Sequence, residues 1–157
     1  MSNNIPVEEH EGSMDLIFEK PPEKSNVIPF PSSSSKLVHL ERKIWVTFEV
    51  EGIHCYPAAK DIEGVEFLQY PHRHMFKFLV EISVQHEDRE IEFILFKRWL
   101  QSLYKDGVLQ ANYKSCEMLA HDLVLQIDAK YPKRFITVTV SEDNENGATI
   151  SYRTLNG

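Results

Sequence analysis

The stretch YPHRHMFKFLVEISV, residues 70–84, decides the fold. Apolar side chains recur at every second position from residue 76, which predicts a strand that is buried on one face. These positions are Phe76, Phe78, Val80, Ile82 and Val84. His72 and His74 stand at the head of the strand, and residues two apart on a strand project from the same face. The stretch therefore predicts a half-buried strand that presents two aligned imidazoles, which are the start of a metal site.

A second strand precedes this one. In KLVHLERKIWVTFEVEGIH, residues 36–54, β-branched and aromatic side chains partly alternate, with Ile44, Val46, Phe48 and Val50 on one face, and His54 ends the stretch. If the two strands pair as a hairpin, the end of the first lies beside the start of the second, so His54 joins His72 and His74. Three neutral imidazoles with a vacant fourth position are the ligand set of catalytic zinc. The sequence thus predicts a Zn²⁺ site at these three histidines.

The rest of the chain predicts two helices followed by two strands. Residues 92–105 and 115–132 carry apolar side chains at helical spacing, and the second segment opens on Ser115, a good N-cap. Residues 134–142 and 147–153 read as strands, joined by an acidic turn in which Asn146-Gly147 is a hairpin signal. Residues 105–113 read as a break. The order β-β-α-α-β-β predicts an α+β fold, a four-stranded antiparallel sheet with two helices on one face.

Composition limits the other functions. Residues 1–36 hold five of the eight prolines and the run SSSS, which predicts a disordered or loosely packed tail before a single domain at 37–157. A net charge of −7 argues against a nucleic-acid partner. Neither a transmembrane run nor a signal peptide is visible, and the two cysteines form no disulfide framework. We therefore expect a cytoplasmic protein without a membrane or nucleic-acid partner.

From Trp45 to Tyr152 the chain resembles the pyruvoyl- and carboxy-tetrahydropterin synthases, members of the T-fold (tunnelling-fold) group. The resemblance begins with GIH at the end of the first strand and with HRH, where the family has His-Gly-His. It continues with EFILFKRWL, where the family has Asp-Phe before a helix, and KSCEMLAHDL, where it has a Pro-Thr-x-Glu helix start. VTVSED stands where the family has a strand ending in Glu-Thr. The order of elements agrees, so the resemblance implies a T-fold for residues 37–157.

The resemblance also implies a ligand. In that family zinc is held by the histidines that match His54, His72 and His74, and the glutamate that matches Glu142 clamps the 2-amino-4-oxo edge of a pterin ring. Guanine and 7-deazaguanine, as in queuosine metabolism, carry the same edge. Residues at the helix start, here Ser115, Cys116 and Glu117, help to hold the ring. Without the resemblance, Glu142 reads as a solvated carboxylate that enters an acidic turn, Ser115 as a simple N-cap, and Glu117 as a favourable charge in the first turn of the helix.

Two departures concern catalysis. The family's catalytic cysteine lies four residues before the histidine pair, where this chain has Leu68. Cys55, next to His54, is the candidate substitute base, although strand alternation turns it away from the histidine face unless the chain bends. The family's Asp-His relay aligns with Asp106, which is present, and with Gly107, which replaces the histidine.

Three hypotheses follow. The first is a zinc-dependent carbon-oxygen lyase or synthase of the tetrahydropterin synthase type, with Cys55 and Asp106 as catalytic candidates. The second is an inactive relative that binds or sequesters a pterin- or nucleotide-like ligand, and the third is a structural oligomer without such a site. The resemblance implies a homo-oligomer, a trimer or hexamer around a tunnel, and a sheet with helices on one face leaves its other face for such a role.

Overall fold

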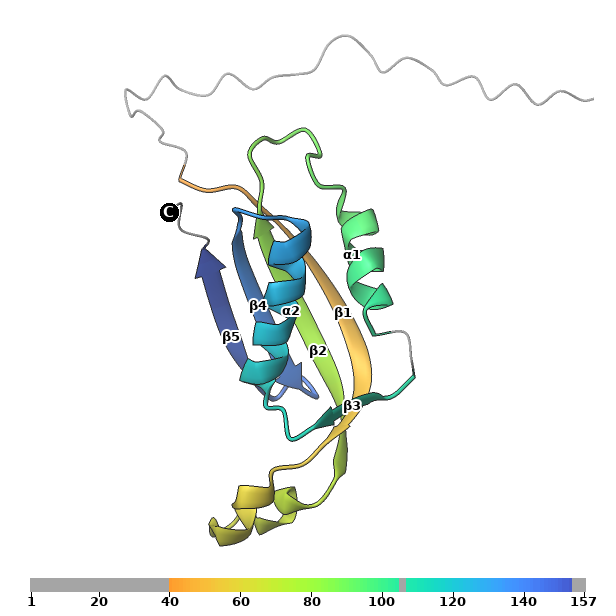
Figure 1. Ribbon diagram of the computed structural model, residues 1–157, viewed down its shortest axis with the longest axis vertical. Coiled ribbons are helices and arrows are strands. Elements are labelled where there is room, and N and C mark those ends of the chain that lie inside the picture. The colour runs from red at the N-terminus through yellow and green to blue at the C-terminus, as the bar shows by residue number, and fades with distance from the viewer. Residues whose placement is uncertain (1–39, 105–106, 154–157) are drawn as a thin grey trace, which may run out of the picture. The chain divides into compact units, whose positions relative to one another are not determined.

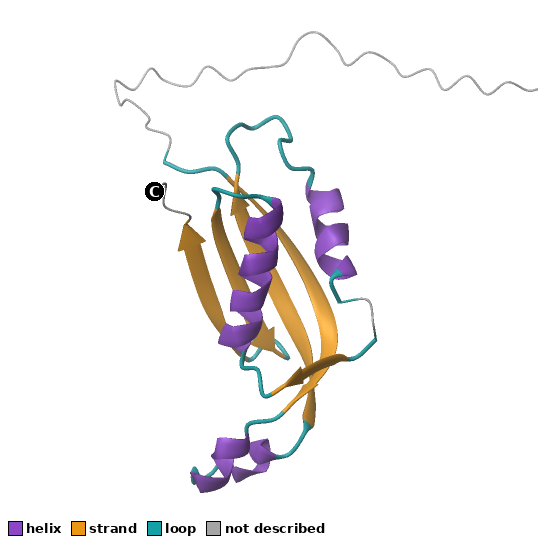
Figure 2. Cartoon of the chain, in the orientation of Figure 1, coloured by secondary structure: helices purple, strands orange, loops and turns teal. Residues whose placement is uncertain are grey.

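The computed structural model describes residues 40–104 and 107–153 (Figure 1). These described residues form five strands, two α-helices and two 3₁₀ helices, and Figure 2 shows helices in purple and strands in orange. In chain order they are β1 (Lys43–His54), η1 (Pro57–Asp61), η2 (Glu66–Gln69), β2 (His72–Ser83), α1 (Phe93–Ser102), β3 (Leu109–Asn112), α2 (Cys116–Lys130), β4 (Phe135–Glu142) and β5 (Asn146–Arg153). The predicted α+β class is confirmed. The predicted tail at 1–36 and the boundary after it lie outside the described residues.

The sheet has the strand order β3-β1-β2-β4-β5. β1 and β2 pair antiparallel from Lys43 opposite Ser83 to His54 opposite His72, and β4 and β5 continue the sheet antiparallel. The prediction of four antiparallel strands was wrong, because β3 adds a fifth strand that runs parallel to the end of β1. β3 has only four residues, of which Ala111 alone is buried, so its sequence offers no alternation long enough to read as a strand.

Both α-helices lie against the apolar face of the sheet (Figure 1). Alternation along β2 makes this face, and Phe76, Phe78 and Val80 are at most 1% exposed. Phe96 and Leu100 of α1 and a stripe on α2 complete the core. Phe93 and Leu103, which continue the predicted stripe of α1, are instead 52% and 39% exposed. They stand at the first residue of this ten-residue helix and just beyond its last.

The predicted acidic turn joins β4 to β5, but not at its hairpin signal. Asp143 and Asn144 adopt left-handed backbone conformations, with φ of 52° and 66°, and make the turn. Asn146 and Gly147, the predicted hairpin signal, already belong to β5. Gly147 serves close packing of strands instead, since a Cβ there would lie 2.2 Å from the Val140 carbonyl oxygen. Asp and Asn tolerate the left-handed region better than most residues, which explains why the turn forms at Asp143 and Asn144.

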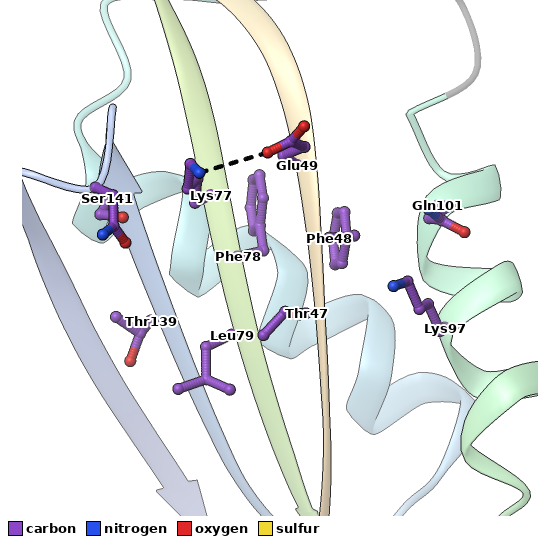
Figure 3. A pocket seen from close by; sticks show the side chains of 11 residues that line it. Thr47, Phe48, Glu49, Lys77, Phe78, Leu79, Lys97, Gln101, Thr139 and Ser141 are labelled. Carbon is purple, nitrogen blue, oxygen red and sulfur yellow. Dashed lines mark ion pairs between the residues drawn. The ribbon is translucent and has the colours of Figure 1, made fainter.

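The opposite face of the sheet is polar. Hydroxyl pairs join β4 to β5, with 2.9 Å between Thr137 and Ser151 and 2.7 Å between Thr139 and Thr149. Lys77 forms an ion pair with Glu49 beside a pocket of about 650 Å³ that also receives side chains from α1 (Figure 3). Polar side chains of β1, β2, β4 and β5 thus line the face that the helices leave uncovered. As for the helices, none within 40–104 and 107–153 has the length and apolarity needed to cross a bilayer.

Candidate metal centre

His54, His72 and His74 converge at one end of the β1–β2 hairpin. His54 is the last residue of β1 and pairs with His72, the first residue of β2, while His74 lies two residues further along β2. The ring centroids are 4.6 to 5.1 Å apart. One nitrogen from each ring lies within 4.8 Å of the other two, so the three histidines could hold a metal ion. The convergence predicted from the sequence is thus present.

Each imidazole is anchored through its Nδ1 atom. Nδ1 of His54 lies 3.2 Å from the Lys114 carbonyl oxygen, and that of His72 lies 2.8 Å from the Tyr70 carbonyl oxygen. Nδ1 of His74 lies 2.5 Å from Oδ2 of Asp143. An oxygen without a hydrogen can only accept, so Nδ1 is the donor in each contact, and in the neutral imidazole this leaves the lone pair on Nε2. Metal-ligating histidines in proteins are held in this manner.

Two buried Nε2 atoms of the centre lack a hydrogen-bond partner in the described part of the chain. They belong to His54 and His74. Buried polar atoms without partners cost free energy, and proteins rarely leave them so. A bound cation would satisfy both atoms, and neutral imidazole nitrogen is a common metal ligand. The donor set therefore fits a metal ion on grounds of chemistry as well as distance.

Glu142 brings a carboxylate to the same centre from the end of β4. Oε1 lies 3.3 Å from Nε2 of His54, and Oε2 lies 3.8 Å from Nε2 of His74, although neither contact is aligned as a hydrogen bond. Cys116, at the start of α2, donates its thiol hydrogen to Oε1 across 3.7 Å. Burial, and secondarily the Glu142 charge, raise the pKa of Cys116 to about 12. Cys116 is thus a protonated thiol that faces a carboxylate.

A pocket of about 200 Å³ opens beside the histidines. Its wall includes His54, His72 and Glu142 together with Cys55, Leu68 and Ser115. Cys55 follows the last residue of β1, where the chain leaves the sheet and the Cys55 N–H donates to the Asn112 carbonyl at 2.7 Å. It therefore reaches the histidine side despite strand alternation. Larger pockets on the sheet face and beside α1 contain none of the predicted site residues, so we assign the chemistry to the small one.

The remaining predicted residues have other places. Ser115 caps α2 by accepting the Met118 N–H at 3.4 Å, as its sequence position predicts, and also borders the pocket. Glu117 is exposed on the first turn of α2, where a hydrogen bond from Ser115 lowers its pKa. Asp106 lies outside the described residues. Gly107 has φ of +86°, a conformation that favours glycine over the histidine of the resembling family.

Sequence reasoning missed the groups that anchor the histidines. Two are backbone carbonyls, of Tyr70 and Lys114, which no side-chain pattern can reveal. The third is Asp143, which lies 69 positions from His74 in the chain. Its only signal is position, because it directly follows Glu142 at the end of a strand that pairs with β2.

The sequence matches none of the known protein-family models, and no curated protein matches it. The case for the metal centre therefore rests on its own geometry.

Proposed function

We propose that this chain is a zinc-binding T-fold protein of the tetrahydropterin-synthase type, which acts on or binds a reduced pterin or another ligand with a guanine-like edge. The observation that carries the proposal is the meeting of three Nδ1-anchored histidines with Glu142 at one pocket. Zinc suits a site of three neutral imidazoles with room for a further ligand. When bound, it would act as a Lewis acid toward the hydroxyl oxygens of a substrate side chain.

The pocket supplies the groups needed for a ring with adjacent N–H donors. Glu142 is 26% exposed at its side chain, so its carboxylate is accessible yet partly shielded from water. A carboxylate accepts two parallel N–H bonds from such an edge, and this pairing is selective as well as strong. The amino end of α2 lies beside it, where Ser115 borders the pocket. We propose that Glu142 exchanges its contact with Cys116 for the ring.

Whether the protein catalyses a reaction or only binds its ligand depends on whether the pocket holds a group that can take up a proton. Leu68 stands in the pocket wall, at the position of the family's cysteine, and leucine cannot take up a proton. Cys55 borders the same pocket and is the available thiol. We propose Cys55 as the substitute base, and Asp106, which lies outside the described residues, is the alternative candidate. The alternative is a relative that binds its ligand without turnover, and the presence of Leu68 favours it.

The test separates ligand binding from turnover. Zinc-loaded protein should show a higher melting temperature with a reduced pterin or guanine, and Glu142→Gln should abolish this shift while still binding zinc. Absence of a shift in the wild type would contradict the proposed ligand class. Conversion of dihydroneopterin triphosphate, lost in Cys55→Ala, supports the enzyme. If the wild type does not convert this substrate and Leu68→Cys does, the protein is a binding protein that lost its base.

We further propose a homo-oligomer. Along β1, only Gly52, Ile53 and His54 pair with β3, so the outer edge from Lys43 to Glu51 carries no strand within 40–104 and 107–153. The outer edge of β5 is open in the same described part. Open edges invite pairing with another chain. The pocket of about 200 Å³ is also below the ~300 Å³ typical of ligand sites, as expected if a second subunit completes it. Light scattering on the purified chain should give a multiple of the monomer mass of 18.3 kDa, and a monomer would contradict assembly.

A further inference from the structure

Asp143 connects the β4–β5 turn to the histidine centre. It directly follows β4 and adopts the left-handed conformation, with φ of 52°. Its backbone N–H donates to the Met75 carbonyl oxygen at 3.1 Å, and its Oδ1 accepts the Met75 N–H at 2.9 Å. Its other oxygen, Oδ2, lies 2.5 Å from Nδ1 of His74. Both carboxylate oxygens are therefore committed, one to the backbone of β2 and one to the neighbouring imidazole.

The contacts of Asp143 bear on which ring nitrogen of His74 carries the proton. The two hydrogen bonds with Met75 hold Asp143 at a fixed place along β2, directly beside His74. Oδ1 of Asp143 accepts the Met75 N–H and Oδ2 faces Nδ1 of His74, so both oxygens of the carboxylate are placed as acceptors. An ionised carboxylate has no hydrogen to give, and Nδ1 of His74 must supply the proton. In the neutral ring the lone pair is then on Nε2, which is buried and makes no hydrogen bond within the described residues.

We propose that Asp143 is a positioning residue that fixes the tautomer and ring orientation of His74 as a metal ligand. The inference rests on the proposed metal-binding function and deepens it. Carboxylates that accept from a ligating imidazole raise its basicity and orient its ring, and their removal weakens metal affinity about 10- to 100-fold. Of the three anchors, Asp143 alone is a side chain, since His54 and His72 bond to backbone carbonyls. It is thus the one anchor that substitution can remove.

A purely structural role makes a different prediction. If Asp143 served only the turn, asparagine would replace it well, because asparagine also tolerates positive φ and its Oδ1 can accept the Met75 N–H. The asparagine NH₂ would then face Nδ1 of His74, and two donors cannot share a hydrogen bond. His74 would move its proton to Nε2 and lose its lone pair there. The same swap in the serine-protease triad leaves the geometry intact but yields the wrong histidine tautomer.

The experiment compares Asp143→Asn, Asp143→Ala and Glu145→Gln with the wild type. Glu145→Gln is the matched control, because it removes a charge from the same turn at an exposed side chain without contact to His74. Long-range proton–nitrogen NMR of metal-free, histidine-labelled protein reads the tautomer, and competition with a chelator reads zinc affinity. We expect the proton of His74 on Nδ1 in the wild type and in Glu145→Gln, and on Nε2 in Asp143→Asn.

Zinc affinity should fall about 10- to 100-fold in both Asp143 variants and stay at the wild-type value in Glu145→Gln. Wild-type affinity in Asp143→Asn and Asp143→Ala, or an unchanged His74 tautomer in Asp143→Asn, would overturn the inference while leaving the metal site intact. A wild type that binds no zinc would overturn the proposed function and this inference together.

Discussion

His54 and Glu142 face each other across the centre, with 3.3 Å between Nε2 and Oε1. The same carboxylate oxygen accepts the thiol hydrogen of Cys116, so the end of β1, the end of β4 and the start of α2 meet at one oxygen atom. Elements that are distant in sequence are thereby held together at the site. Substitution of Glu142 should therefore change the environment of Cys116 as well as that of the histidines.

Thiol reactivity tests the link to Cys116. The thiolate is the reactive form, and a pKa of about 12 leaves very little of it at neutral pH. Alkylation should modify the half-buried Cys55 well before Cys116. Glu142→Gln removes the charge that favours the protonated thiol, so the pKa of Cys116 should fall and its alkylation should accelerate. Peptide mass spectrometry measures both rates.

Glu117→Gln is the control for the thiol experiment. The Glu117 charge contributes the least of the causes that raise the pKa of Cys116, so its removal should change the alkylation rate less than Glu142→Gln does. Equal labelling of Cys55 and Cys116 in the wild type would contradict the raised pKa.

Gly52→Ala tests the support of the histidines. A Cβ at Gly52 would lie 2.7 Å from the Phe76 ring and 3.2 Å from the Leu109 carbonyl oxygen. Phe76 would have to move, and its ring packs edge-on against both His54 and His74. We expect a loss of about 1–3 kcal/mol in the free energy of unfolding and weaker zinc binding. Urea denaturation and zinc titration provide the two readouts.

Gly64→Ala serves as the comparison for Gly52→Ala. Its φ of +88° makes alanine unfavourable, but a Cβ there meets nothing within 4 Å. This variant should lose about 1 kcal/mol and keep wild-type zinc affinity. A Gly52→Ala protein with unchanged zinc affinity would show that Phe76 does not support the centre.

The Glu90 carboxylate should make the free energy of unfolding depend on pH in the acidic range. Its carboxylate receives two hydrogen bonds from Arg134 and one from the Gln85 N–H, and the Arg134 contact chiefly lowers its pKa below 4.5. A lowered folded-state pKa means that the stabilisation is complete above the unfolded value and disappears as the pH falls through the folded value. Glu90→Gln should cost about 1–2 kcal/mol at neutral pH and almost nothing in strong acid.

Urea midpoints across this pH range measure the Glu90 effect. Asp88→Asn, in the same loop and exposed, should leave the pH dependence as in the wild type. If Glu90→Gln lowered the midpoint equally at neutral and strongly acidic pH, the ion pair with Arg134 could not be the cause.

Local pattern was enough to predict much of this structure. Alternation at Phe76, Phe78 and Val80 identified the buried face of β2, and hairpin pairing then placed His54 beside His72. Ser115 marked the start of α2 because capping is a local interaction. In each of these cases the residues that decide the outcome are close in sequence or joined by one short pairing.

What escaped prediction depends on distant partners. β3 is a strand only because the end of β1 pairs with it, and its four residues carry no pattern of their own. The contact between Asp143 and His74 requires both the β2–β4 register and the left-handed turn after β4. The turn itself forms at Asp143 and Asn144 and not at Asn146-Gly147, because close strand packing already uses Gly147.

Zinc titration of metal-free protein by calorimetry tests the central claim most directly. We predict one zinc ion per chain in the wild type and in His86→Ala, whose histidine is exposed in the loop after β2. His54→Ala, His72→Ala and His74→Ala should each lose this binding, because a site of three imidazoles cannot spare one. A wild type that takes up no zinc, or a His72→Ala variant that binds as the wild type does, would contradict the account.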